Sequence, residues 1–371
     1  MSARISEDGP DQLRRDVRGL IGSWRAAGRF VPRSDAWLRS ADVEFSKELA
    51  ARGLIGMTWP QPYGAGASNV ARLAVTEELL RAGAPVAAHW VADRQIGPAI
   101  LRHGSERLRE EILPGIASAD HLFCLGMSEP EAGSDLAAVR TRAVEVADGY
   151  ELTGRKIWTS NAHRATHIYV LARTTPVDAV ERKHQGLTEF IVDMSSPGIT
   201  VTPIVDLAGE HHFNEVTFDH VRVPAHRVLG TAGNGWTQVM EQLSFERGGP
   251  ERVLSTYPLL VRVLAEAGLP EARPQLGRLI ARLAVLRQLC LRIAERLDAG
   301  EAPIQEAATC KYLGNVFEHD VIELARTALA NGAEHLRGAF GDALLASPGF
   351  SIRGGAAEVL LSIITKQELN S

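Results

Sequence analysis

The chain has 371 residues, of which 45% are hydrophobic, enough for sizeable cores and too many for a disordered chain. Its 40 basic and 45 acidic residues give a formal net charge of −5, which argues against a nucleic-acid-binding protein. The widely spaced Cys124, Cys290 and Cys310 offer neither a disulfide framework nor a metal-ligand motif, so we expect a reducing compartment. Because no apolar run reaches the ~20 residues of a membrane span and residues 1–10 lack a signal-peptide pattern, a cytoplasmic protein is expected.

Residues 1–118 are predicted to form an amino-terminal α-helical domain. Apolar residues recur with helical spacing between Asp11 and Ala27, and the same pattern predicts helices at 45–52, 69–82 and 91–103. The segment Pro60–Gly66 is rich in helix breakers and is expected to be a loop. A further helical segment at 107–112 is expected to end at Pro114 and Gly115.

Residues 119–231 are predicted to form an antiparallel β domain. Apolar and polar residues alternate between Val144 and Leu152 around Asp148-Gly149, a pattern typical of a β-hairpin. Further short strands are predicted at 167–172, 189–193, 199–202 and 215–218. We expect Pro197, Pro203 and Pro224 to separate these strands.

Residues 232–371 are predicted to form a carboxy-terminal helical bundle that serves oligomerisation. Helical periodicity returns at Gly235, and the clearest helices are expected at 281–297 and 307–329. The predicted fold class is therefore α+β and mainly α, with a helical domain, a central β domain and a second helical domain in that order.

The segment Leu125–Asp135 follows a predicted strand and is rich in small residues. Such a loop can bring backbone amides and hydroxyls close to a polar ligand, although an ordinary turn has the same composition. Together with three further blocks, this segment resembles the acyl-CoA dehydrogenase family, and the blocks occur in the order of that family. They are 59–66 with 77–83, 125–135, 149–161 and 212–224. The resemblance implies the family's fold and FAD as the cofactor.

The resemblance implies that blocks 125–135 and 149–161 contact the flavin. The contacts implied in the first block are Leu125, Met127 and Ser128 on the pyrimidine side and Gly133 and Ser134 near the pyrophosphate. In the second block, Trp158 is implied to flank the isoalloxazine ring and Ser160 to reach towards N5, whereas Trp158 taken alone could equally be a core aromatic. Ser128 and Ser160 stand where the family usually has Thr, so the hydroxyl is kept and a methyl group is lost.

The family's reaction requires a base that removes the α-proton of an acyl thioester while a hydride leaves the β-carbon for flavin N5. Many members carry this Glu in a carboxy-terminal Tyr-Glu-Gly-Thr motif, but Gly354 holds that position here. Members that resemble isovaleryl-CoA dehydrogenase carry the base on an earlier helix, and Glu246 matches that site. Glu246 is therefore the implied catalytic base.

The local pattern around Glu246 leaves two interpretations open. On a helix, Glu246 would share an apolar face with Val239, Leu243 and Val253, and Gly248-Gly249-Pro250 would interrupt the helix beside it. Alternatively, Glu246 is a surface residue that pairs with Arg247, and Pro250 begins a new helix. Glu251 is the fallback base.

Residues that the family donates to a neighbouring subunit's flavin are altered in this chain. Arg273 is the implied contact of this kind that remains, and Gly354, Gly355 and Glu358 are further implied cofactor contacts. Ala284 replaces a usual Gln, Thr327–Ala333 lacks the usual Gln and paired glycines, and Ala356-Ala357 replaces Thr-Ser. These departures favour a hetero-oligomer with a second homologous subunit, whereas a divergent homotetramer is the alternative.

The leading functional hypothesis is an FAD-dependent acyl-CoA dehydrogenase that passes electrons to an electron-transferring flavoprotein. The alternatives are a partner subunit with little activity of its own and a desaturase of a carrier-protein thioester. The stretch Gly83–Trp90 is rich in small residues, which suits either a roomy acyl pocket or tight helix packing. No metal site is expected at two pairs of histidines that lie close together in sequence, His163 with His167 and His211 with His212.

Overall fold

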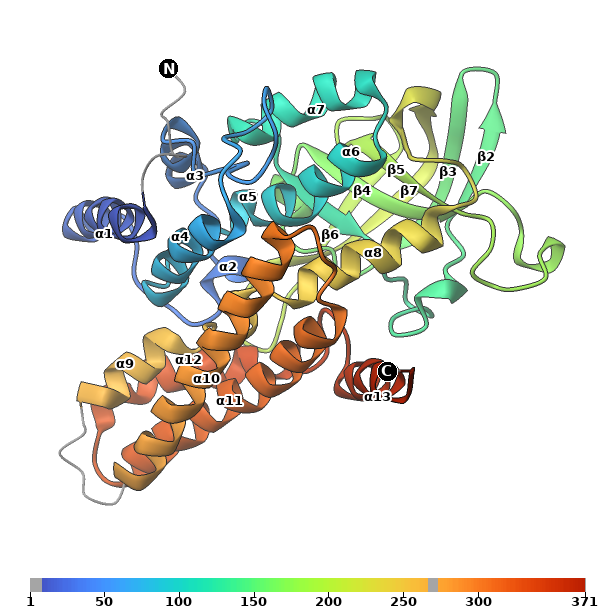
Figure 1. Cartoon of the computed structure of the whole chain (residues 1–371). Coiled ribbons are helices and arrows are strands. Elements are labelled where there is room, and N and C mark those ends of the chain that lie inside the picture. The colour runs from blue at the N-terminus through green and yellow to red at the C-terminus, as the bar shows by residue number, and fades with distance from the viewer. Residues whose placement is uncertain (1–8, 266–272, 371) are drawn as a thin grey trace. The chain divides into compact units, whose positions relative to one another are not determined.

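The computed structural model describes residues 9–265 and 273–370, with the side chains of 243–247 and 367–370 outside that description. The chain divides into two compact units (Figure 1). The first combines residues 1–41, 66–87 and 243–371, and the second combines 42–65 and 88–242. No helix in the described part of the chain has both the length and the apolar character that crossing a membrane requires. The boundaries at 118/119 and 231/232 stay predictions.

The second unit contains an eight-stranded sheet with the order β6-β7-β3-β2-β4-β5-β8, and β1 pairs with β4. The strands are β1 (Phe123–Gly126), β2 (Arg142–Val146), β3 (Gly149–Lys156), β4 (His167–Arg173), β5 (Leu187–Asp193), β6 (Ile199–Ile204), β7 (Phe213–Pro224) and β8 (Val228–Leu229). Most pairs are antiparallel, as expected, but β4 lies parallel to both β1 and β2. The sheet is therefore mixed around β4.

The predicted hairpin is confirmed, because β2 and β3 pair with Val146 opposite Gly149. Pro224 is the last residue of β7 and separates it from β8, as expected. The strand break expected at Pro203 is wrong, because Pro203 lies inside β6. Because β6 is an edge strand that pairs only with β7, a proline without an N–H is tolerated there. One face of the sheet buries an apolar cluster that includes Phe190 and Val192 of β5.

Short helices accompany the sheet in the second unit, and two of them cross into the first. They are α3 (Val43–Ala51), α5 (Ala87–Val91), a π-helical turn (Ala92–Ile96), α6 (Gly97–His103), α7 (Glu106–Ala117) and α8 (Gly235–Arg247). The helix expected at 91–103 thus begins earlier and contains a π turn. The end expected at Pro114 is wrong, since α7 continues to Ala117. Gly115 instead allows close approach of the His121 ring, whose Nδ1 would lie 2.2 Å from an added Cβ.

The first unit is helical. Its helices are α1 (Pro10–Ala26), α2 (Ala36–Arg39), α4 (Asn69–Arg81), α9 (Tyr257–Ala265), α10 (Arg273–Asp298), α11 (Ile304–Ala330), α12 (Arg337–Ala346) and α13 (Ala357–Asn370). The long helices α10 and α11 pack along each other (Figure 1). Glu77 on the buried helix α4 accepts from Arg287 Nε at 2.8 Å, which joins α4 to α10. Burial raises the pKa of Glu77, but bonds from Arg287 and Arg14 outweigh it and hold the pKa below its usual value.

Candidate functional site

The structure brings together the two segments that were predicted to contact the flavin. The Ile157 amide donates to the Ser128 carbonyl at 2.9 Å. Lys156 Nζ, at the end of β3, donates to the Met127 carbonyl at 3.1 Å. The loop that follows β1 is therefore held against the end of β3, and residues far apart in sequence form one surface.

A buried ion pair stabilises the loop that follows β1. Lys156 Nζ lies 2.8 Å from Glu129 Oε1, and the Lys156 side chain is fully buried. Glu129 also accepts from the Arg140 amide at 2.6 Å and the Thr141 amide at 2.8 Å. Burial raises the pKa of Glu129, but Lys156 and the amides outweigh it and lower the pKa. Burial lowers the pKa of Lys156 to about 8, so both groups are mainly charged at pH 7.

Trp158 is presented at the surface by a tightly held loop. Its side chain is 56% exposed, and its ring packs edge-on against Phe213 at 5.6 Å between centroids. Trp158 and Asn161 both have left-handed backbones, with φ of 59° and 58°. Asn214 fixes the loop, because its backbone carbonyl accepts from the Thr159 amide at 2.9 Å and its Nδ2 donates to the Thr159 carbonyl at 3.0 Å. The core-aromatic interpretation of Trp158 is therefore wrong, and strained residues that a surrounding network over-determines are typical of ligand-binding sites.

The remaining predicted contacts of this segment offer polar groups to a ligand. Among the described residues, the half-buried hydroxyls of Ser128 and Ser160 make no hydrogen bond to another protein group. Gly133 and Ser134 are exposed, and a Cβ added at Gly133 would meet open space. Leu125 and Met127 are half-buried. An exposed aromatic face beside available hydroxyls and an open glycine loop fits a large flat cofactor with a polar tail.

The helix that carries Glu246 is formed as expected, but its apolar face is shorter than predicted. Glu246 lies in the last turn of α8, which ends at Arg247 before Gly248-Gly249. Its side chain lies outside the described residues. Val239 is buried on α8, whereas Val253 follows a separate 3-10 turn, Pro250–Arg252, so placing it on the same helical face is wrong.

The fallback base, Glu251, lies in that 3-10 turn and is largely buried. Its carboxylate bends back over its own turn, because Oε2 would lie 2.0 Å from a Cβ added at Gly249. The absence of a side chain at position 249 therefore makes room for this carboxylate. The structure gives Glu251 a packing role within the turn.

The remaining implied cofactor contacts lie on two elements of the first unit. Arg273 is the exposed first residue of α10. Gly354 and Gly355 have φ of 68° and 114° in the turn before α13, and Glu358 is exposed in the first turn of that helix. Arg353 holds this turn through two bonds to the buried Asp35 carboxylate at 2.5 and 2.6 Å. The roles of these residues stay predictions.

Comparison with known proteins decides the family. Models of the acyl-CoA dehydrogenase N-terminal, middle and C-terminal domains match residues 23–120, 124–221 and 267–369. The acyl-CoA dehydrogenase IpdE1 of Mycobacterium tuberculosis is 34% identical over 366 residues, which cover 95% of this chain and 91% of that protein. The chain belongs to the acyl-CoA dehydrogenase family. The predicted resemblance and fold class are confirmed.

Two further similarities are to proteins of Mycobacterium tuberculosis. The acyl-CoA dehydrogenase FadE34 of Mycobacterium tuberculosis is 36% identical over 330 residues, which are 86% of this chain but only 45% of FadE34. The chain thus spans less than half the length of that relative. The structure of the ChsE4–ChsE5 complex from Mycobacterium tuberculosis superposes with a TM-score of 0.81 and 28% identity, over 98% of this chain and 97% of that one.

The four histidines considered as metal ligands contact other groups of this acyl-CoA dehydrogenase family member. His163 stacks on His211 at 4.2 Å between centroids, and His211 Nε2 lies 2.7 Å from Asn214 Oδ1. Burial lowers the pKa of His167 to about 4. His212 lies near two carboxylates that the sequence did not suggest, those of Asp206 and Glu210, with ligand-type atoms within 4.8 Å of one another. Its Nδ1 lies 3.5 Å from Asp206 Oδ2, a distance that suits an ion pair.

Small residues at 83–86 serve close packing in the first unit. Helix α5 begins only at Ala87, so residues 83–86 precede it. Gly83 has a φ of 58°, and a Cβ there would lie 2.8 Å from the Arg33 amide nitrogen. At this end of the stretch, the structure favours tight packing over a roomy pocket.

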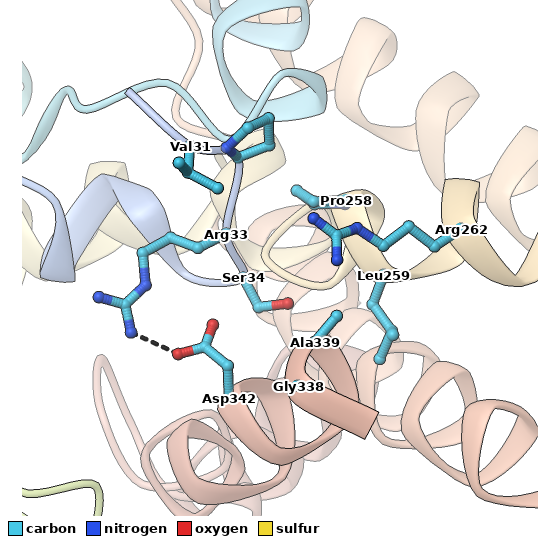
Figure 2. A pocket seen from close by; sticks show the side chains of 10 residues that line it. Val31, Arg33, Ser34, Pro258, Leu259, Arg262, Gly338, Ala339 and Asp342 are labelled. Carbon is cyan, nitrogen blue, oxygen red and sulfur yellow. Dashed lines mark hydrogen bonds and ion pairs between the residues drawn. The ribbon is translucent and has the colours of Figure 1, made fainter. Parts of the chain in front are cut away.

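A cavity of about 310 Å³ lies near Arg33 in the first unit (Figure 2). Val31, Pro258 and Leu259 supply part of its apolar wall, and an ion pair between Arg33 and Asp342 closes one side. None of the predicted cofactor contacts lines this cavity. Its lining residues are therefore different from those proposed to contact the flavin.

Sequence reasoning missed a buried acid. Glu189 lies in the middle of β5 with no exposed surface, and it meets side chains of α8. The only signal for it was an acidic residue near the start of a short strand whose other acid, Asp193, is its last residue. From the sequence, Glu189 is expected only as the first residue of a strand at 189–193.

Proposed function

We propose that this chain is an FAD-dependent acyl-CoA dehydrogenase that introduces a Cα–Cβ double bond into an acyl-CoA thioester. One observation carries the proposal: the two segments with family flavin motifs are bonded together and present Trp158 with two available hydroxyls, those of Ser128 and Ser160. Family membership supports the reaction class, oxidation of a CH–CH bond.

The residues of this chain fit FAD. Trp158 would flank the flavin ring, and the Ser128 and Ser160 hydroxyls would bind its polar edge. Gly133 and Ser134 would approach the pyrophosphate, where an exposed loop without side-chain bulk suits a charged group. FAD, when bound, supplies the acceptor for the electron pair that leaves the β-carbon. Arg273 is the contact proposed for a neighbouring subunit's FAD, and Gly354, Gly355 and Glu358 are further proposed FAD contacts.

Glu246 is the proposed base that removes the α-proton. Gly354 leaves the more common position of the family without a carboxylate, and Glu246 matches the other position. Its place in the last turn of α8, directly before Gly248-Gly249, supports the role. A carboxylate near the buried Val239 would gain basicity from desolvation.

The reaction is tested with the purified chain reconstituted with FAD. Mixed without oxygen with a panel of acyl-CoAs of different length and branching, it should lose its flavin absorbance with at least one. The product should be 2 Da lighter than the substrate, because two hydrogens leave. Stable flavin absorbance with every acyl-CoA, together with bleaching by an acyl-carrier protein, would instead support a carrier-protein desaturase.

A second candidate is a subunit that needs a homologous partner to complete its flavin site. The altered residues at Ala284 and Ala356-Ala357 support it, as does similarity to one chain of the ChsE4–ChsE5 complex. Large apolar side chains are exposed on or beside the carboxy-terminal helices, at Leu313, Val316, Ile352 and Leu361. Purification with and without a genomically adjacent homologue tests this, because one FAD per subunit in a homotetramer would contradict it.

The proposed electron acceptor is an electron-transferring flavoprotein. It is tested by adding such a protein to the acyl-CoA-reduced chain. Flavin absorbance of this chain should return at a rate that increases with the concentration of the acceptor. An unchanged rate would point to another acceptor.

A further inference from the structure

The buried acid on β5 is bonded to one helix. Gln238 Nε2 of α8 donates to Glu189 Oε2 at 3.0 Å, and Gln242 Nε2 donates to the same oxygen at 3.1 Å. Tyr169, on the neighbouring strand β4, lies beside Glu189, and among the described residues its buried hydroxyl has no hydrogen-bond partner. Glu189 thus sits where β4, β5 and α8 meet within the second unit.

The carboxyl group is neutral at pH 7. Burial raises its pKa to about 8, and Tyr169, Gln238 and Gln242 only partly oppose that effect. Glu241, the remaining titratable group that acts on it, raises the pKa further. A buried polar group with several good partners specifies one arrangement of the elements that it joins, since each broken bond leaves an unsatisfied group.

The contacts of α8 are arranged so that its first three turns are fixed. Gln238 and Gln242 are four residues apart and therefore share one face, and Gln238 Nε2 also donates to the Leu229 carbonyl at 3.0 Å. On an adjacent face, Glu241 pairs with Arg102 and with His103 Nε2, the latter at 2.8 Å. Glu246 follows Gln242 by four residues on the same helix, just over one turn later.

We propose that Glu189 is a positioning residue that fixes α8, through Gln238 and Gln242, in the orientation that presents Glu246 to its substrate. This inference rests on the proposed function, in which Glu246 is the base. A helix rotates about 100° for each residue. If the contact of Gln242 with Glu189 is lost, a rotation of α8 therefore changes the direction of the Glu246 side chain one turn later. A misplacement of about 1 Å is enough to cost roughly 100-fold in rate.

The test compares Glu189→Ala with Glu189→Gln and with a matched control, Val192→Ala. Val192 is on the same strand and is buried in the cluster on the opposite face of the sheet, so its truncation loosens β5 without touching α8. Two readouts are taken from the FAD-loaded chain: hydrogen–deuterium exchange of α8 residues 239–247 and the rate of flavin bleaching by an acyl-CoA.

Glu189→Ala should speed amide exchange in α8 and lower the bleaching rate at saturating acyl-CoA about 10- to 100-fold, with KM changed less than threefold. Glu189→Gln keeps a neutral side chain of the same shape and should restore most of both. Val192→Ala should change neither by more than about threefold. The proposal is wrong if Glu189→Ala and Val192→Ala behave alike in both readouts.

Two further variants keep the result interpretable. If Glu189→Ala does not fold, Gln242→Leu removes the link nearest to Glu246 and should reproduce both effects, whereas unchanged exchange and bleaching in it would overturn the proposal. Glu246→Gln should abolish bleaching while α8 exchange stays unchanged. If Glu246→Gln keeps its bleaching, the proposed base is wrong even where Glu189→Ala loosens α8, so the two failures are distinguishable.

Discussion

Trp158 is the residue whose environment differs most from what its chemistry alone suggests. A tryptophan with 56% of its side chain exposed, on a left-handed backbone, contributes little to folding and is available to a ligand. The hydrogen bonds of Asn214 and the contact with Phe213 offset the conformational cost of this left-handed backbone. At this residue, the structure favours binding over stability.

We therefore expect Trp158→Ala to weaken FAD binding at least tenfold while the free energy of unfolding of the FAD-free chain changes by less than about 1 kcal/mol. Titration of the FAD-free chain with FAD and urea denaturation provide the two measurements. Trp158→Phe should retain most of the affinity. A loss of about 3–5 kcal/mol in stability, typical of a buried tryptophan, with FAD affinity unchanged would contradict this assignment.

The ion pair between Lys156 and Glu129 leads to a second prediction at the residue scale. Lys156→Met leaves the Glu129 carboxylate buried without its cation and should destabilise the chain by about 3–5 kcal/mol. Glu129→Gln in the Lys156→Met background should recover part of that loss, because the stranded charge is removed. Urea denaturation of both single variants and the double variant measures the coupling, and simple additivity would show that the pair does not act as a unit.

At the scale of elements, the link between β5 and α8 predicts a pH dependence of stability. The pKa of Glu189 is about 8 in the folded chain against 4.5 in the unfolded one, so the folded state binds more protons between these values. Its contribution to stability is full below pH 4.5 and is lost as the pH rises through 8. The loss is up to about 1.4 kcal/mol per pH unit in that interval.

Glu189→Gln cannot titrate and should remove this part of the slope. Urea denaturation of wild type and Glu189→Gln at pH 5, 7 and 9 measures it, and the difference between the two curves isolates Glu189 from other groups that titrate. Relative to the wild type, the free energy of unfolding of the variant should increase as the pH rises. Parallel curves would contradict the assignment of a neutral buried carboxyl.

Some elements could be predicted from local sequence and others depended on tertiary context. The hairpin at Asp148-Gly149 follows from turn chemistry, which acts within four residues. Pro203 could not be placed, because its tolerance depends on β6 being at the sheet edge. Glu189 was missed because an acid in a strand pattern does not reveal the glutamines that a helix 49 residues later brings to it.

At the scale of the whole molecule, the family motifs were the decisive signal. They identified the segments proposed to contact the flavin, and the structure joins those segments through hydrogen bonds of Ile157 and Lys156. Composition alone gave only a globular chain of mixed helix and strand. The departures from the family at Ala284 and Ala356-Ala357 remain the basis for proposing a homologous partner, and flavin stoichiometry decides between that and a homotetramer.

The central claim is that Glu246 is the base of an acyl-CoA dehydrogenase. It is tested most directly by the rate of flavin bleaching in FAD-loaded Glu246→Gln, with Glu251→Gln as the matched control, since that carboxylate folds over its own turn. Glu246→Gln should bind FAD normally and bleach at least 1,000-fold more slowly, on the order of 4 kcal/mol in the barrier, while Glu251→Gln stays within about tenfold of wild type. Wild-type bleaching in Glu246→Gln, or its loss only in Glu251→Gln, would contradict the account.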